Sequence, residues 1–523
     1  MESFTCARKS AVERGRPQSS VDSFARGLPE KQKGGSFSRL ALRVPHRYLL
    51  DFVGSLSGGQ GRNRTTDTRI FNPLLYQLSY LAVPSRTAAR LTPGKTAKYI
   101  GGTPAGQTVG GAHCGAAYNR SMNARNVSFD VVVAGRGAVG AATALGLAQA
   151  GLRVGWVGPV ASVPTTAPQG WDSRVFALSP GTRELLRTLR VWDAMPAARI
   201  APVYDMRVYG GPQADAPELH LDAYSGRIEA LAWIVENRTL VGTLDAAIGF
   251  AGVASIDDTV TAMCVDEGPL GAATLELASG RTLAAKLVVA ADGADSTLRT
   301  LAGIEPRVRA YGQRGVVANF DTTLPHGDTA FQWFGEDLGV LALLPLPAAS
   351  PERGRASMVW SAPDALAETL LSLSPEALAE RVAEATHRTL GALTTITPAQ
   401  SFALRLIRVP RLIAPRMVLV GDAAHAMHPL AGQGMNVGFG DVAVLLDVLR
   451  GREPYRELGD PLLWRRYERA RREAVSLMQD ATDGIKRAFG PLPAPLVGLR
   501  DLGWRAVARS DWIRRRMIAQ AAR

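Results

Sequence analysis

The sequence from residue 416 to residue 436 reads Arg416-Met-Val-Leu-Val-Gly421-Asp422-Ala-Ala-His425-Ala-Met-His428-Pro429-Leu-Ala-Gly432-Gln433-Gly434-Met435-Asn436. Its first part, from Met417 to Val420, is an apolar run that predicts a short buried strand, which Gly421-Asp422 ends. Pro429 and the glycines after it predict a tight loop, and Val437 to Leu449 has the apolar spacing of a helix. The stretch is therefore expected to run strand, loop, helix.

This loop predicts a ligand site at the edge of a sheet. Backbone N–H groups and the positive end of the following helix would point at one place, which suits an electron-rich, partly anionic group. Asp422 adds a carboxylate that accepts hydrogen bonds, and a sugar-like hydroxyl could donate to it. A plain strand-to-helix turn is the alternative, but the Gly432-Gln433-Gly434 that follows favours a ligand.

A second glycine-rich turn lies near the start of the regular pattern. Asp130 to Ala134 predicts a strand, Gly135-Arg-Gly137-Ala138-Val139-Gly140 a turn, and Ala141 to Ala150 a helix. In this context the G-x-G-x-x-G pattern indicates a dinucleotide-binding unit, although a turn without a ligand is the alternative. The acidic residue that usually ends the second strand is missing, because Gly158 and Pro159 stand there, so ribose hydroxyls must bind elsewhere or more weakly.

Three further segments supply candidate residues. Lys286 to Ala291 predicts a strand that ends in Asp292-Gly293, a second ligand-facing loop, although Asp-Gly is also a common turn pair. Asp172-Ser-Arg174 precedes another predicted helix, and Ile234 to Arg238 is expected to open an amphipathic helix. Arg174 and Arg238 could equally be ordinary surface side chains.

The net charge of +13 suggests a nucleic-acid partner until the charge is located. Residues 1–121 carry 18 Lys/Arg and 6 Asp/Glu, whereas the rest of the chain carries 42 and 41. The body is thus close to neutral, which removes the electrostatic case for nucleic-acid binding. Only Cys264 of the three cysteines lies in the body, so no cysteine-based metal site is expected there.

Residues 1–121 have no sustained helical or strand period and are rich in Ser, Thr, Gly, Pro and Arg. This composition permits a transit peptide or plain disorder. The stretch from Gly61 to Tyr80 instead resembles conceptual translations of non-coding DNA, and Met122 would then be the first residue. We favour this third interpretation and expect the extension to have no function.

Three dispersed motifs, at Gly135 to Gly140, at Asp292-Gly293 and at Gly421-Asp422, occur in the order and spacing of the flavoprotein aromatic hydroxylases. The chain resembles this para-hydroxybenzoate hydroxylase-like family, and the closer similarity is to the ubiquinone-biosynthesis hydroxylases. That similarity covers residues 127–523 and rests on Asp172-Ser-Arg-Val-Phe-Ala-Leu, Glu236-Asn-Arg238, Gly312-Gln313, Val317-Ala-Asn319 and the segment from Gly421 to Asn436.

The patterns and the resemblance together predict a mixed α/β (α+β) fold. It comprises a Rossmann-like FAD-binding domain, an inserted antiparallel-sheet substrate domain and a helical C-terminal tail. The expected limits are 127–203, 230–305 and 402–450 for the discontinuous FAD-binding domain, 204–229 and 306–401 for the substrate domain, and 451–523 for the tail.

The resemblance implies FAD as the cofactor and a role for each motif. Gly135, Gly137, Ala138, Val139 and Gly140 would hold its ADP part, Arg174 and Arg238 would contact it, and Asp292 with Gly293 would lie near its pyrophosphate. Asp422, beside Gly421, would bind the ribityl chain. Pro429, Gly432, Gln433, Gly434 and Met435 would line the isoalloxazine ring, and Asn436 completes the set of candidates.

The implied reaction is hydroxylation of the aromatic ring of a polyprenylated phenol in ubiquinone biosynthesis, with NAD(P)H and O2. A flavin-dependent reductase of isoprenoid substrates and a non-catalytic FAD-binding subunit of a biosynthetic assembly are the alternatives. His425 and His428 are candidates for the base that activates the phenol, but no spacing assigns a catalytic residue. Their i,i+3 spacing lacks a third ligand, so no metal site is expected.

The tail suggests how such a substrate is reached. Leu502, Trp504, Val507, Trp512, Ile513 and Met517 alternate with several arginines, and no charge-free apolar run in the chain reaches the length of a membrane span. We therefore expect a cytoplasmic protein with peripheral contact to the inner membrane. A tail helix packed on the body, or docking to other ubiquinone-biosynthesis enzymes, would use the same residues.

Overall fold

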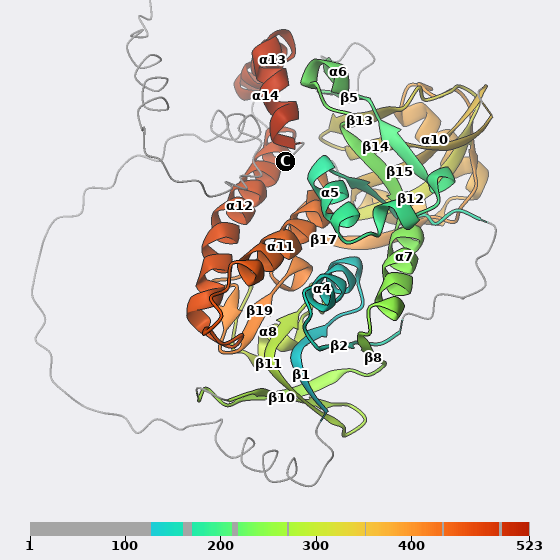
Figure 1. Ribbon diagram of the computed structural model, residues 1–523. Coiled ribbons are helices and arrows are strands. Elements are labelled where there is room, and N and C mark those ends of the chain that lie inside the picture. Colours follow the sequence, from blue (N-terminus) through green and yellow to red (C-terminus); the bar gives the residue numbers. More distant parts are fainter. Residues whose placement is uncertain are drawn as a thin grey trace, which may run out of the picture. The chain divides into compact units, whose positions relative to one another are not determined.

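The fold is built around a largely parallel sheet that carries the predicted cofactor loops at one edge (Figure 1). The computed structural model describes residues 127–160, 170–211, 218–268, 271–350, 352–430, 433–490 and 494–521. The predicted extension, residues 1–121, and the candidate Gly432 lie outside these ranges. All the described residues belong to one compact unit, Asp67–Arg523.

The first sheet has the strand order β18-β19-β11-β1-β2-β8; β10 pairs with β11, and β9 pairs with β10. Its strands are β1 (Val127–Ala134), β2 (Val154–Val157), β8 (Ala254–Ile256), β9 (Val260–Val265), β10 (Ala273–Leu277), β11 (Thr282–Ala290), β18 (Ile413–Ala414) and β19 (Met417–Leu419). β1 pairs in parallel with β2 and β11, and β11 with β19. The three candidate loops follow β1, β11 and β19, so they meet at the carboxyl edge of this sheet, where ligands bind in open α/β sheets.

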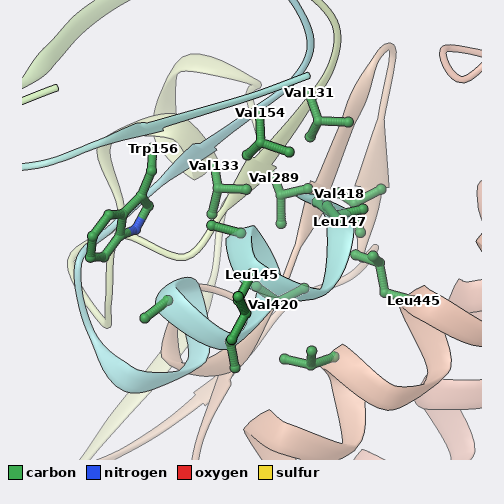
Figure 2. Close-up of a cluster of buried hydrophobic side chains, with 14 of the residues drawn as sticks. Val131, Val133, Leu145, Leu147, Val154, Trp156, Val289, Val418, Val420 and Leu445 are labelled. Carbon is green, nitrogen blue, oxygen red and sulfur yellow. The ribbon is translucent and has the colours of Figure 1, made fainter. Parts of the chain in front are cut away.

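The core beneath these loops is made by side chains from consecutive parallel strands (Figure 2). Val133 of β1, Val289 of β11 and Leu145 of α4 (Ala138–Gln149) belong to the same buried cluster. α4 is apolar on all sides because it lies between the sheet, α7 (Asn237–Phe250) and α11 (Gln433–Arg450). Each such buried side chain contributes about 1.5–3 kcal/mol, so the glycine loops are mounted on a rigid base.

The second sheet is mostly antiparallel, with the order β20-β17-β12-β15-β14-β13-β5-β6 and β16 beside β12. Its strands are β5 (Asp205–Tyr209), β6 (Glu218–Asp222), β12 (Arg307–Thr322), β13 (Thr329–Gly335), β14 (Gly339–Ser350), β15 (Arg353–Pro363), β16 (Leu393–Thr395), β17 (Gln400–Arg408) and β20 (His425–Ala426). The inserted sheet predicted from alternating runs is thereby confirmed. The predicted limit at residue 402 falls inside β17, and the domain limits remain a prediction.

A third, three-stranded sheet and several helices complete the described chain. The strands are β3 (Val175–Leu178), β4 (Ile200–Val203) and β7 (Ala232–Glu236). The remaining helices are α5 (Pro180–Thr188), η1 (Trp192–Ala194), η2 (Ala197–Arg199), α6 (Ala223–Gly226), α8 (Thr297–Leu301), α9 (Asp364–Ser372), α10 (Pro375–Ala385), η3 (Gly421–Ala423), α12 (Pro461–Ala488), α13 (Ala494–Arg509) and α14 (Asp511–Ala521). The helical tail was therefore predicted correctly.

One local prediction was wrong. Ile234 to Glu236 were expected to open a helix, but they belong to β7 and pair with β3 and β4, and the helix begins at Asn237. Ile234 and Val235 are β-branched and favour extended backbone when strands lie on both sides of them. The presence of those partner strands cannot be predicted from the sequence of this segment. The rest of the prediction holds, because Leu240, Leu244 and Ile248 are the buried face of α7.

Candidate functional site

The loop after β1 passes very close to the end of β11. Gly135 has a φ of +122°, and a Cβ atom there would lie 2.0 Å from the backbone oxygen of Ala291. A Cβ at Gly140 would lie 2.2 Å from the oxygen of Gly135, which also accepts a 2.9 Å hydrogen bond from the Trp156 indole. Both positions therefore require glycine for steric reasons, as the tight turn and the helix–strand contact predict.

Gly137 is different, because nothing lies within 4 Å of the position that its Cβ would take. It is the N-cap of α4 and provides no side-chain cap, so a ligand could accept hydrogen bonds from the first N–H groups of that helix. Gly137, Ala138, Val139 and Gly140 all line one cavity. The residues present thus fit the pyrophosphate of a dinucleotide, whose charge the helix N-terminus favours.

The loop after β19 is fixed by a buried ionic group, which consists of Asp441, His425 and Arg471. The backbone N–H of Gly421 donates to Asp441 Oδ2 at 2.8 Å, and the same oxygen lies 2.7 Å from His425 Nε2. Arg471 Nε, on α12, donates to Asp441 Oδ1 at 2.6 Å. All three side chains are at most 2% exposed, so helices α11 and α12 fix the loop that carries Asp422.

The Asp422 carboxylate opens onto the cavity, and no side-chain or backbone donor in the described part of the chain hydrogen-bonds to it. The surrounding protein still desolvates the carboxylate and so raises its pKa above the usual aspartate value, while His425, Arg174 and Arg405 oppose the shift. An acceptor with no partner, facing a cavity, suits a hydroxyl-bearing chain such as the ribityl group.

Replacing Asp422 by alanine is expected to weaken FAD binding roughly 10- to 100-fold, because a charge-assisted hydrogen bond worth about 1.5–3 kcal/mol is lost. The measurement is the fraction of flavin retained through dialysis. Arg405→Ala is a useful comparison, since Arg405 also lines the cavity but pairs with Asp295. Retention by Asp422→Ala equal to that of the wild type would refute the assignment.

The segments around residues 172 and 237 form one hydrogen-bonded unit. The Asp172 carboxylate accepts the backbone N–H groups of Arg174 and Arg238 at 3.1 and 3.0 Å. The buried Glu236 accepts from the N–H of Asp172 at 2.6 Å, and Asn319 Nδ2 donates to the Asp172 carbonyl at 2.8 Å. Arg174 lines the cavity, whereas Arg238 is not one of the described residues that do.

Two other candidates have polar contacts of their own. Both Asp292 oxygens accept hydrogen bonds at the start of α8, from the Ser296 hydroxyl and the N–H of Leu298, while the neighbouring Gly293 lines the cavity. The Asn436 amide accepts from the N–H of Ser179 at 2.9 Å and donates to the carbonyl of Ala177 at 2.8 Å. Both side chains therefore fix loop geometry, whatever ligand the loops hold.

Of the remaining candidates, Gly421, Pro429, Gly434 and Met435 line the same cavity. Gly434 lies in the first turn of α11, and a Cβ there would meet nothing within 4 Å. The helix N-terminus thus faces the cavity near Pro429, as required for donors to an electron-rich ring. Gln433 begins α11, and its side chain is not described.

His428 is fully buried, and its Nε2–H donates to the Gln313 side-chain oxygen at 3.1 Å. Burial and the nearby Lys486 lower the pKa of His428 to about 3, so its imidazole is neutral at neutral pH. Neither His425 nor His428 is among the described residues that line the cavity. Across the described ranges, no group of three or more His, Cys, Asp or Glu side chains could hold a metal ion.

The cavity has a volume of about 820 Å³ and extends well beyond the loops. Its far part, here called the apolar arm, is lined by Leu219, Leu221, Phe334, Val340, Leu430, Ile485, Trp504 and Met517. These residues come from β6, β13, β14, the segment after Pro429, and helices α12, α13 and α14. α13 and α14 lie against β6 and α6 (Figure 1), so the C-terminal helices form a wall of the cavity.

Comparison with known proteins agrees with this geometry. Residues 128–482 match the family described as FAD binding domain. The 3-demethoxyubiquinol 3-hydroxylase of Escherichia coli (strain K12) is 31% identical over 398 residues, which cover 76% of this chain and 99% of that protein. The chain belongs to the FAD-dependent aromatic hydroxylases that include the ubiquinone hydroxylases. FAD is thus the cofactor, and the protein is a monooxygenase.

One further relative supports the family, and a solved structure supports the fold. The ubiquinone hydroxylase UbiL of Rhodospirillum rubrum is 33% identical over 399 residues, covering 75% of this chain and 89% of that protein. The crystal structure of p-nitrophenol 4-monooxygenase PnpA from Pseudomonas putida DLL-E4 matches with a TM-score of 0.58 at 18% identity, over 76% of this chain and 98% of that chain. The predicted fold and family are confirmed.

Sequence reasoning missed two sets of residues that shape the site. Asp441 and Arg471 follow the quoted stretch at helical positions that look like ordinary polar sites. The apolar arm was also missed, because its residues come from segments separated by up to about three hundred positions. Only the mixture of Trp504 and Met517 with arginines in the tail gave a signal, and it was interpreted as a membrane contact.

Proposed function

We propose that this hydroxylase acts on the aromatic ring of a polyprenylated phenol in ubiquinone biosynthesis, using NAD(P)H and O2. The observation that carries the proposal is one continuous cavity that joins the FAD-binding loops to a wall of apolar side chains. A phenol ring with a long hydrocarbon substituent matches this division into a polar and an apolar part. Burial of the hydrocarbon contributes about 0.8 kcal/mol per CH2 group.

FAD supplies the redox and oxygen chemistry when bound, and the chain supplies position and seclusion. The sheet face and the C-terminal helices exclude water from the ring. The N–H groups at the start of α11 favour negative charge on the neighbouring cofactor ring. Asp422 and the Gly137 backbone hold the cofactor at a fixed place relative to Pro429, which lines the same cavity.

Replacing Leu221 by tryptophan is expected to block the apolar arm without touching the loops. Leu221 lines the cavity from β6, where an indole would occupy the space proposed for the prenyl chain. We expect kcat/KM for 2-geranylgeranylphenol to fall at least about 10-fold, since burial of several CH2 groups is lost. The value for 2-methylphenol, which needs no arm, should change less than about 3-fold. An equal loss for both phenols would contradict the proposed use of the arm.

A flavin-dependent reductase of isoprenoid double bonds would also use an apolar arm. Oxygen uptake separates the two reactions: a hydroxylase consumes one O2 for each product formed, and a reductase consumes none. A non-catalytic FAD-binding subunit would leave NAD(P)H oxidation unchanged by any phenol. The membership in the hydroxylase family favours the first reaction.

We also propose that the outer face of α13 and α14 contacts the membrane in which such a substrate dissolves. Leu502 is 66% and Trp512 71% exposed, and Arg505, Arg509 and Arg516 are exposed beside them. Trp504, Val507 and Met517, which were expected at that interface, are buried instead and face the body. No helix of the described chain is both long enough and apolar enough to cross a membrane.

The FAD-loaded protein is expected to bind phosphatidylglycerol vesicles at low salt and to release them as the salt concentration rises. Basic groups at an anionic surface contribute about 1 kcal/mol each, and tryptophan favours the interface. Trp512→Ser should weaken sedimentation with the vesicles. The same change at Tyr455, which is 79% exposed but precedes the C-terminal helices in the sequence, should not. Absence of binding at low salt would leave the outer face without this role.

A further inference from the structure

A polar amide side chain lies among the apolar residues of the cavity wall. Gln332 of β13 lines the cavity and is 7% exposed. On the same strand, Ala330, Phe331 and Phe334 also line the cavity, and all three are apolar. The amide of Gln332 makes no hydrogen bond to any described part of the chain. The amide atoms are not among the fully enclosed polar atoms of the described residues, so they are open to the cavity, where a ligand or water can bind them.

The neighbours across the sheet leave this amide isolated. Gln332 pairs with Val208 of β5 and with Ala342 of β14, and Ala342 pairs in turn with Val359 of β15. All three of these side chains line the cavity and are apolar. The amide therefore stands alone in a row of small apolar side chains, which gives a ligand room to approach it.

The clusters on either side of Gln332 place it between the cofactor loop and the apolar arm. Ala330, two residues before it, packs in one buried cluster with Ala177, whose carbonyl accepts from Asn436. Phe334, two residues further along β13, packs in the same buried cluster as Leu430, which directly follows Pro429 of the cofactor loop. The same cluster contains Trp504 and Met517 of the arm. A substrate whose tail lies in the arm and whose ring reaches Pro429 would thus pass Gln332 with its ring or the first atoms beside it.

We propose that Gln332 binds an oxygen substituent of the substrate ring and so determines which ring carbon faces the cofactor. The proposal rests on the proposed function, since it assumes a phenol in this cavity. The amide can donate to a ring oxygen or accept from a phenolic hydroxyl, and Gln332 can do both where its neighbours can do neither. Gln332 is a specificity-determining residue in this scheme and takes no part in proton transfer.

The test compares two probes that differ by one hydroxyl, 2-geranylphenol and geranylbenzene, in calorimetric titrations of the FAD-loaded enzyme. The wild type is expected to bind the phenol about 10-fold more tightly, the usual effect of one hydrogen bond in a dry site. Gln332→Leu, of similar size, should bind both probes equally, and Gln332→Asn should keep part of the preference. Gln149→Leu makes the same exchange at the exposed last residue of α4, where the amide donates to the Leu189 carbonyl away from the cavity, and it should bind like the wild type.

Retained preference for the phenol in Gln332→Leu, or no preference in the wild type, would overturn the proposal. If Gln332→Leu does not fold with its FAD, Gln332→Asn gives the same decision, since an unchanged preference there would also overturn it. A separate assay follows hydroxylation of 2-geranylphenol by the wild type. No product, together with a preference that depends on Gln332, would refute the proposed reaction and leave the binding role intact.

Discussion

Replacing Asp441 by alanine is expected to lower the free energy of unfolding by about 3–5 kcal/mol, because it leaves the buried Arg471 without its counter-charge. It also removes the acceptor that holds the Gly421 N–H. The measurement is the midpoint of urea unfolding. Asp447→Ala is the matched control on the same helix, where Asp447 pairs with Arg450 and both side chains are exposed by about half or more. A surface pair of this kind contributes at most about 1 kcal/mol, so equal losses in the two variants would contradict the role of Asp441.

The pH dependence of the same comparison gives a second check. Burial by itself would raise the pKa of Asp441, but His425 and Arg471 outweigh it and hold the pKa below the usual aspartate value. A lowered pKa in the folded state means that the stabilisation is complete above the unfolded pKa of about 3.9 and is lost as the pH falls through the folded pKa. The difference between wild type and Asp441→Ala should therefore be constant near neutrality and shrink only in acid below about pH 4.

Asp441 also shows where prediction from the sequence ends. The glycine turns, Asp422 and the strand–loop–helix order could be predicted, since each depends on residues adjacent in the chain. The buried ionic group could not, because Asp441 and Arg471 are thirty residues apart on two helices and have no local pattern that separates them from surface charges. The prediction of a helix at Ile234 to Glu236 was wrong for a related reason. The two strands that pair with this segment, and not its own sequence, decide its conformation.

The cavity illustrates the same limit at larger scale. Its cofactor end is made of short motifs with a fixed spacing, and most of these residues line it as a set. Its apolar end is assembled from β6, β13 and the last three helices, whose apolar residues individually resemble core positions. Gln332 is the clearest case: within its segment it is one polar residue in a strand, and only the sheet register shows that its neighbours are apolar. Function in this hydroxylase is thus encoded locally for the cofactor and non-locally for the proposed substrate.

Two single changes in the first glycine loop are expected to separate folding from cofactor binding. Gly135→Ala should lower the free energy of unfolding by about 2–4 kcal/mol, because a φ of +122° is open only to glycine and the new Cβ would lie 2.0 Å from the Ala291 oxygen. Gly137→Ala should lower it by at most about 1 kcal/mol, the cost of alanine at an N-cap, since φ is −73° and its Cβ would meet no atom.

Both variants should nevertheless lose FAD, for different reasons. In Gly135→Ala the loop is displaced, whereas in Gly137→Ala the new methyl group stands where the pyrophosphate approaches the backbone. Thermal unfolding of the apoprotein and titration with FAD measure the two effects separately. Wild-type FAD affinity in Gly137→Ala would show that the cofactor does not approach this backbone. A normal melting temperature for Gly135→Ala would mean that the backbone at Gly135 and Ala291 can move apart to accept the methyl group. Glycine would then be needed at position 135 for the ligand alone.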